Sequence, residues 1–252
     1  MSDFRNSHSI PATADMSVDA GLRSFMLGVY NKVALGLLVS AVLAYITGSY
    51  PPVRDLMFST AVGPDGVTRL AGFTLLGMIV AFSPLVILLG SNFVMKNPTS
   101  GGAGALYWLI VALIGASMGT VVLVYTGASV VQTFLITAAA FGALSLFGYT
   151  TKKDLTGIGS FLIMGVIGLI IAMVVNMFLQ SSMMALIISA IGVLIFSGLI
   201  AYDTQRLKMT YYALGGDKAA MGVATGFGAL SLFINFINLF QFLLMFMGGN
   251  RE

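Results

Sequence analysis

Seven long apolar runs dominate this chain, and they limit what it can fold into more than any other feature. Each run is close to the ~20 residues that an α-helix needs to cross the hydrocarbon core of a bilayer. Lipid offers no partner to an exposed peptide group, so such runs predict a bundle of membrane-spanning helices. We place the helices at 25–48, 70–91, 105–125, 130–149, 158–179, 183–204 and 223–247.

The composition agrees with an all-α integral membrane protein. Hydrophobic residues make up 58% of the 252 residues and charged residues only 8%, whereas a soluble domain carries about 25% charged residues. Soluble enzymes, disordered chains and, since there is no cysteine, disulfide scaffolds are excluded. We expect residues 1–24 to form a mobile cytoplasmic tail and residues 25–252 to form a single seven-helix transmembrane domain.

The distribution of basic residues predicts a cytoplasmic N-terminus. The net charge of +3 is interpreted as loop charge that sets topology, and not as a surface for nucleic acid. With the N-terminus inside, seven crossings put Glu252 outside, and nine basic residues lie inside against three outside. The inner set is Arg5, Arg23, Lys32, Lys96, Lys152, Lys153, Arg206, Lys208 and Lys218, and the outer set is Arg54, Arg69 and Arg251.

Asp203 is the clearest charged candidate inside a predicted span. A charge at the centre of a membrane helix costs about 2.5–3.5 kcal/mol on insertion scales, so it needs a reason. In one interpretation the helix ends here and Asp203 sits in water, paired with Arg206 at i+3. In the other, the helix continues toward Tyr212 and the carboxylate faces the bundle interior. The sequence leaves both interpretations open.

A polar stripe marks the last predicted span. Ser231, Asn235 and Asn238 fall within about 60° of one another on a helix that turns 100° per residue. Because lipid cannot satisfy these groups, the stripe must face protein or a wet cavity, which puts this span inside the bundle. The stripe either holds the bundle together by interhelical hydrogen bonds or lines a functional site.

Two glycine pairs have the spacing that lets membrane helices approach closely. They are Gly115 with Gly119 and Gly222 with Gly226. Small residues four apart leave a shallow face for a neighbouring helix. In a chain with 30 glycines this pattern is a weak signal.

Several kinds of active site are excluded, and we expect neither enzymatic activity nor a cofactor. The one histidine is His8 in the tail, so no Ser-His pair and no HExxH zinc site can form within the membrane. The last span has no lysine for a retinal Schiff base, and no glycine-rich phosphate loop is present. Asp203 could supply half of an aspartyl dyad, but Asp217 lies in the next loop.

Two segments resemble hallmarks of the transmembrane Bax-inhibitor-motif family, the Bax inhibitor-1-like proteins. One is FGYTTKKDL at 147–155, and the other is GVLIFSG at 192–198 running on through AYDTQ at 201–205. The first span also fits the family's opening, and LSLF at 230–233 with FINLF at 236–240 fits its last helix. The resemblance covers nearly everything after residue 24.

The resemblance implies seven helices, the last central to a ring of the other six, and a pH-sensitive passive calcium leak. In animals it also implies protection against cell death. In calcium-leak members, a carboxylate on the sixth helix shares a proton or hydrogen bond with one on the seventh. Asp203 matches the first position, but Asn235 stands where the family usually has Asp. We therefore expect ion passage and pH sensing at Asp203 and Asn235, supported by Tyr202, Arg206, Ser231 and Asn238.

Asn235 weakens the expected pH switch. Two close carboxylates compete for a proton near physiological pH, whereas an amide carries no charge and donates to the ionised carboxylate. Asp203 is the candidate calcium ligand, although one carboxylate is a poor site for an ion that prefers six to eight oxygens. The expected partners are calcium or other cations and the lipid of a bacterial inner membrane. In the alternative, the protein does not conduct and instead regulates a membrane-anchored protease by binding it.

Overall fold

The computed structural model describes residues 20–63, 66–94 and 97–249, with no side chains described for 92–94. Residues 1–19 of the predicted tail, Lys96, Arg251 and Glu252 lie outside these ranges, and residues 20–24 already belong to a helix. The described chain forms α1 (Ala20–Ser49), α2 (Pro51–Met57), β1 (Phe58–Val62), β2 (Thr68–Phe73), α3 (Leu75–Val94), α4 (Ser100–Ser117), α5 (Gly119–Val124), α6 (Gly127–Thr150), α7 (Thr156–Leu179), α8 (Ser182–Ala213) and α9 (Lys218–Met247).

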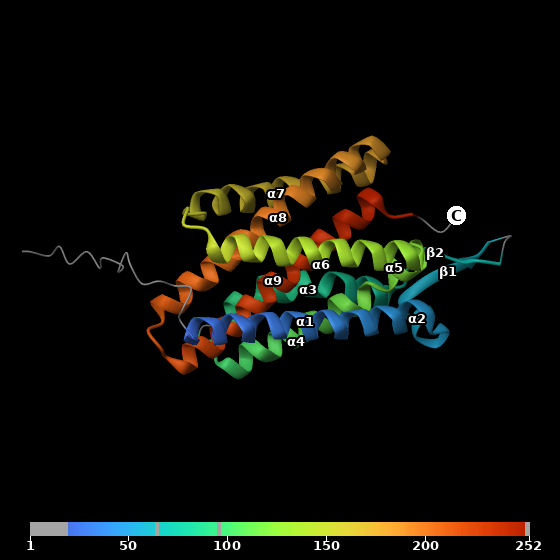
Figure 1. Ribbon diagram of the computed structural model, residues 1–252. Coiled ribbons are helices and arrows are strands. Elements are labelled where there is room, and N and C mark those ends of the chain that lie inside the picture. The colour runs from blue at the N-terminus through green and yellow to red at the C-terminus, as the bar shows by residue number, and fades with distance from the viewer. Residues whose placement is uncertain (1–19, 64–65, 95–96, 250–252) are drawn as a thin grey trace, which may run out of the picture.

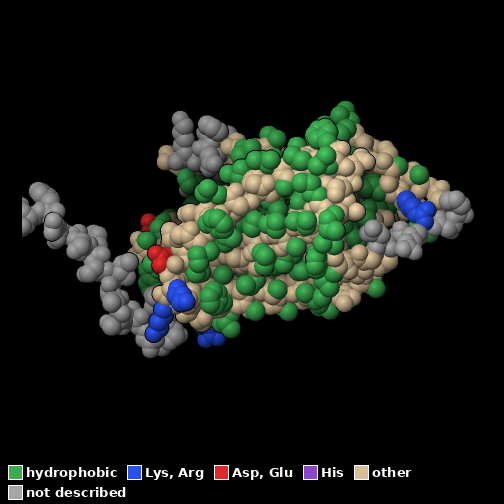
Figure 2. Space-filling model, turned by 90° about the horizontal axis from the view of Figure 1, so that it is seen from above, with side chains coloured by type: hydrophobic (Ala, Val, Ile, Leu, Met, Phe, Trp, Pro, Cys, Tyr) green, Lys and Arg blue, Asp and Glu red, His purple; other side chains and the backbone are tan. Residues whose placement is uncertain are grey.

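The described helices are those of a membrane protein. Six helical segments are long and apolar enough to cross a bilayer, with α4 and α5 counted together, and Leu75–Ser91 of α3 is a shorter apolar segment. Apolar side chains cover the middle of the molecule, while Lys and Arg gather toward its two ends (Figure 2). The prediction of an all-α integral membrane protein is confirmed at this level.

The connection between α1 and α3 corrects the second predicted helix, which was placed at 70–91. Residues Thr68–Phe73 form strand β2 instead, paired antiparallel with β1, and helix α3 begins at Leu75. The apolar run hid the change because a strand also tolerates Leu, Ala and Phe. At the turn, the Gly63 N–H donates to the Val67 carbonyl, so the hairpin satisfies its own peptide groups.

Two other predicted helices have different limits. The span expected at 105–125 is interrupted at Met118, where the helix tightens and α5 restarts at Gly119. The span expected at 183–204 is α8, which continues to Ala213. Hydropathy underestimated the length of α8, because the polar residues that follow Asp203 continue the helix.

Helix α9 is the most buried span, but six helices do not enclose it evenly. It packs against α1, α4, α6 and α8, and 56% of its apolar window is buried, against 11% for α7. Among the described residues, α3 packs chiefly on α4, and α7 packs on α8 at the edge of the bundle (Figure 1). The burial of α9 agrees with the expected central position, with α3 and α7 placed further out than the other helices, and a ring of six helices stays a prediction.

Small residues set the closest helix contacts. A side chain on Gly115 would overlap the backbone of Ser40 in α1, and one on Gly226 would meet Ala103 in α4. A Cβ on Gly148 of α6 would overlap the carbonyl group of Ala201 in α8. The last of these contacts holds α6 against α8 two residues from Asp203.

Candidate functional site

Asp203 lies inside the bundle, in the C-terminal half of α8. It is 5% exposed, and the helix continues past it to Ala213. The carboxylate faces α9, the helix with which α8 packs most extensively. A buried charge of this kind requires hydrogen bonds or an opposite charge.

Three side chains satisfy the Asp203 carboxylate. The Asn235 amide donates to Oδ2 at 2.8 Å, and the Ser231 hydroxyl donates to the same oxygen. On the other side, Nη2 of Arg206 lies 3.1 Å from Oδ1. Ser231 and Asn235 are one helical turn apart on α9, so both can point at a single acceptor. Two donors and one cation therefore hold the Asp203 carboxylate.

The structure combines features of the two interpretations of Asp203. The i+3 pair with Arg206 is present, and the carboxylate is nevertheless buried because α8 does not end there. The Arg206 side chain is 49% exposed, so one end of the ion pair reaches toward solvent while the other is enclosed.

Two residues expected at the site do not contact the carboxylate in the described interactions. The Asn238 amide donates to the Ile234 carbonyl of its own helix at 2.8 Å. The Tyr202 ring lies against Gly159 of α7, and the Arg206 guanidinium lies over that ring at 5.7 Å. Tyr202 thus contacts the partner of Asp203 rather than Asp203.

Sequence reasoning did not single out Gln205 or Lys208. Gln205 accepts the N–H of Leu155 at 2.8 Å and donates to the Lys153 carbonyl at 2.7 Å. The buried Lys208 ammonium donates to the Tyr149 carbonyl at 2.6 Å. Both side chains tie the C-terminal end of α6 and the following loop to α8. The predicted span ended at residue 204, so the sequence prediction left both residues outside the helix that carries them.

The described residues offer little to a resident metal ion. No group of three or more His, Cys, Asp or Glu side chains is close enough to hold a metal in the part of the chain that the structure describes. Asp203 supplies two oxygens, both engaged, whereas calcium takes six to eight. That Asp203 binds calcium stays a prediction. Two oxygens suit brief contact with a passing calcium ion better than a stable calcium site.

Comparison with known proteins decides the family. The profile described as "Inhibitor of apoptosis-promoting Bax1" matches residues 22–252. The chain belongs to the Bax inhibitor-1-like family. It is 68% identical to a protein of Caulobacter vibrioides over the full length of both chains. It is also 38% identical to the inner membrane protein YbhL of Escherichia coli, over 92% of this chain and 94% of that one. This family member is a multi-pass protein of the bacterial inner membrane.

The two segments that carry the Bax inhibitor-1-like resemblance are in contact. Gly148 in the first segment packs directly against Ala201 in the second, and Gln205 bonds to the main chain of Lys153 and Leu155. Asp203 lies in the second segment, two residues from each of these contacts. The family hallmark therefore corresponds to a single structural unit that positions the buried carboxylate.

Proposed function

We propose that this protein is a passive cation leak, with calcium as the leading ion, and that its gate lies at Asp203 and Asn235. The observation that carries the proposal is an acidic side chain, Asp203, that is 5% exposed among apolar membrane helices and is hydrogen-bonded from α8 to α9. Intramembrane carboxylates of this kind commonly mark ion pathways. The proposed activity is transport and not catalysis.

The geometry of the ion pair suggests how the gate is closed. Arg206 neutralises Asp203 and leaves no net negative charge to attract a cation. Because the Arg206 side chain is half exposed, it can swing into solvent without losing its hydration. That movement would uncover the carboxylate, and a cation could then take the place of the guanidinium. Opening thus requires the ion pair to separate.

The proposed topology has seven crossings with the N-terminus in the cytoplasm. Helix α3 has 20 residues, about 30 Å, which matches the hydrocarbon core. Its neighbours in the chain, β2 and α4, start from opposite ends of the bundle (Figure 1). The end that holds Asp203 also holds Lys152, Lys153 and Lys218, which favours the cytoplasmic side.

We further propose that the leak depends only weakly on pH. Two donors and Arg206 surround the Asp203 carboxylate, and no second carboxylate lies among its described contacts. The ionisable groups described at this end also include Tyr30 of α1, Tyr149 of α6, Tyr202 and Lys208 of α8, Lys152 and Lys153 of the α6–α7 loop, and Lys218 of α9. The chain's histidine, His8, lies outside the described residues.

Calcium flux into liposomes tests the leak. Purified protein is reconstituted around a calcium-sensitive dye, and uptake is compared with empty liposomes. We expect wild-type flux above background, at least about tenfold less flux in Asp203→Asn, and increased flux in Arg206→Gln, which frees the carboxylate. Asp154→Asn is the matched control, because Asp154 is a fully exposed carboxyl group in the adjacent loop. Wild-type uptake no faster than that of empty liposomes would overturn the proposal.

The non-conducting regulator remains the second candidate, and one observation favours it. Every described polar contact of Asp203 is already made within the protein, so the site can act as a structural lock between α8 and α9. In that case flux is absent, and a membrane-anchored protease co-purifies with the wild type. Retention of the protease should then fall in Asp203→Asn if the lock shapes the binding surface.

A further inference from the structure

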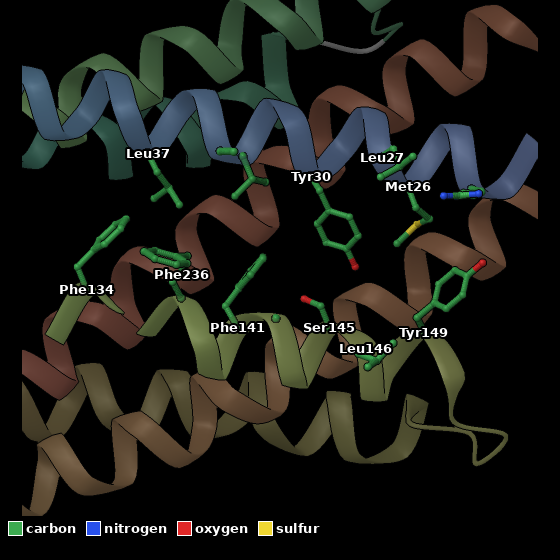
Figure 3. A pocket seen from close by; sticks show the side chains of 15 residues that line it. Met26, Leu27, Tyr30, Leu37, Phe134, Phe141, Ser145, Leu146, Tyr149 and Phe236 are labelled. Carbon is green, nitrogen blue, oxygen red and sulfur yellow. The ribbon is translucent and has the colours of Figure 1, made fainter. Parts of the chain in front are cut away.

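A second feature of the molecule is a cleft between α1 and α6, about 730 Å³ in volume and floored by Phe236 of α9 (Figure 3). This volume lies within the range of small-molecule sites, about 300–1,000 Å³. Helices α1 and α6 both pack on α9, and the cleft separates them from each other. Its walls are largely apolar and include Val33, Leu37, Phe134, Ala138 and Phe141.

The middle of the cleft is polar. Tyr30 and Ser145 lie there on opposite walls, and their hydroxyl groups point toward each other (Figure 3). Ser145 is 5% exposed, and its hydroxyl interacts with the Tyr30 hydroxyl across the cleft. Both hydroxyl groups line the cleft, so they offer polar contacts to an oxygen atom of an occupant.

A cation, Arg23, lies at one end of the cleft. Arg23, in the early turns of α1, lines the cleft and is exposed. The residues that the structure describes provide no carboxylate within ion-pair distance of it. Positive charge beside an apolar slot is complementary to an amphiphile that has an anionic head. It is unfavourable for a cation, so the cleft is not a side entrance to the proposed leak.

The length of the cleft matches one leaflet. From Arg23 to Leu37 the cleft follows α1 for about 21 Å at 1.5 Å per residue. One leaflet together with its polar head-group region spans half of about 40–45 Å. A slot of this length holds one acyl chain and places the head of the lipid beside Arg23.

We propose that the α1–α6 cleft binds one anionic phospholipid. The acyl chain lies between the two helices over Phe236, a glycerol or ester oxygen reaches Ser145, and the phosphate pairs with Arg23. Space for the chain is present at Gly142 on the cleft wall, where an added Cβ would meet no atom within 4 Å. The inference is independent of the proposed leak, because lipid binding is measured without ion flux.

Native mass spectrometry of the full chain tests the lipid site with two probes, phosphatidylglycerol and phosphatidylcholine that carry the same acyl chains. We expect one phosphatidylglycerol bound at least about tenfold more tightly than phosphatidylcholine, the scale of one charge-assisted contact. Gly142→Leu fills the cleft and should weaken phosphatidylglycerol binding at least about tenfold. Arg23→Gln should remove the preference for phosphatidylglycerol.

Two matched variants control for general effects. Gly168→Leu adds the same side chain to α7, where Gly168 is exposed and also has open space. Lys152→Gln removes an exposed charge in the α6–α7 loop at the same end. Both should bind lipid as the wild type does. Equal binding of the two lipids, wild-type binding in Gly142→Leu, or a second copy of the chain in place of lipid would each overturn the proposal.

Discussion

Helices α7 and α9 are both long and apolar, and they flank α8, yet 11% of the apolar window of α7 is buried against 56% of that of α9. The α9 helix carries Ser231 and Asn235, which bond to Asp203, whereas the exposed face of α7 carries side chains such as Phe161 and Met164. In lipid, an apolar helix gains nothing by hiding its surface. Polar groups and small residues therefore decide which helix lies inside.

The comparison predicts that substitutions near α9 and α8 cost far more than matched ones on α7. Asp203→Ala removes the acceptor of two donors, the buried Asn235 amide and the half-buried Ser231 hydroxyl, and a donor left unsatisfied costs about 1–3 kcal/mol when buried. Because Arg206 is half exposed and can reach water, we expect a total loss of about 2–4 kcal/mol in the free energy of unfolding. Unfolding by detergent titration measures it. Ser160→Ala on α7 should stay within about 0.5 kcal/mol of wild type. An equal loss of unfolding free energy in Ser160→Ala and Asp203→Ala would contradict the expected difference between the two regions.

Glycine-to-alanine substitutions should change the free energy of unfolding in opposite directions in the two regions. Gly148→Ala places a methyl group against the Ala201 carbonyl and forces α6 away from α8, at a cost of about 1–3 kcal/mol. Gly168→Ala meets open space on α7 and should stabilise the helix by about 0.5–1 kcal/mol. The same titration checks both variants. Destabilisation of similar size at both sites would show that α7 is packed against something.

Gln205 should contribute less, since its bonds lie near the surface. Gln205→Ala loses the hydrogen bonds to Leu155 and Lys153 and should cost about 1–2 kcal/mol. The clearest sign is faster proteolysis of the α6–α7 loop, with the other connections cut at wild-type rates. Unchanged loop cleavage would mean that the clamp does not restrain the loop.

The smallest expected effect is at the start of α7. Hydrogen bonds from the side chain and the N–H of Thr156 lower the pKa of the exposed Asp154 carboxyl below its usual 3.8. A lowered folded-state pKa adds stability above the usual value, and this is lost as pH falls through the lowered one. Asp154→Asn should therefore reduce the difference in Tm between pH 5 and pH 3. If the difference in Tm between the two pH values equals that of the wild type, Asp154 does not contribute to the pH dependence of stability.

The sequence predicted the inner position of α9 because Ser231 and Asn235 cannot face lipid. It also suggested both features of Asp203, its pairing with Arg206 and its burial, as alternatives. Hydropathy could not show that they occur together, since that depends on α8 continuing to Ala213. It also missed the β1–β2 hairpin, because apolar residues fit a strand as well as a helix there. The α1–α6 cleft arises from helix separation, which no local pattern encodes.

The central claim is that Asp203 meets an amide instead of a second carboxylate, and calcium uptake as a function of pH tests it most directly. Flux into liposomes is measured from pH 6 to pH 8 for wild type and Asn235→Asp, which places two carboxyl groups where Asn235 Nδ2 and Asp203 Oδ2 are now 2.8 Å apart. Close carboxylates cannot both ionise freely, so the variant should respond steeply to pH while the wild type changes little. An equally steep response in the wild type would contradict the account.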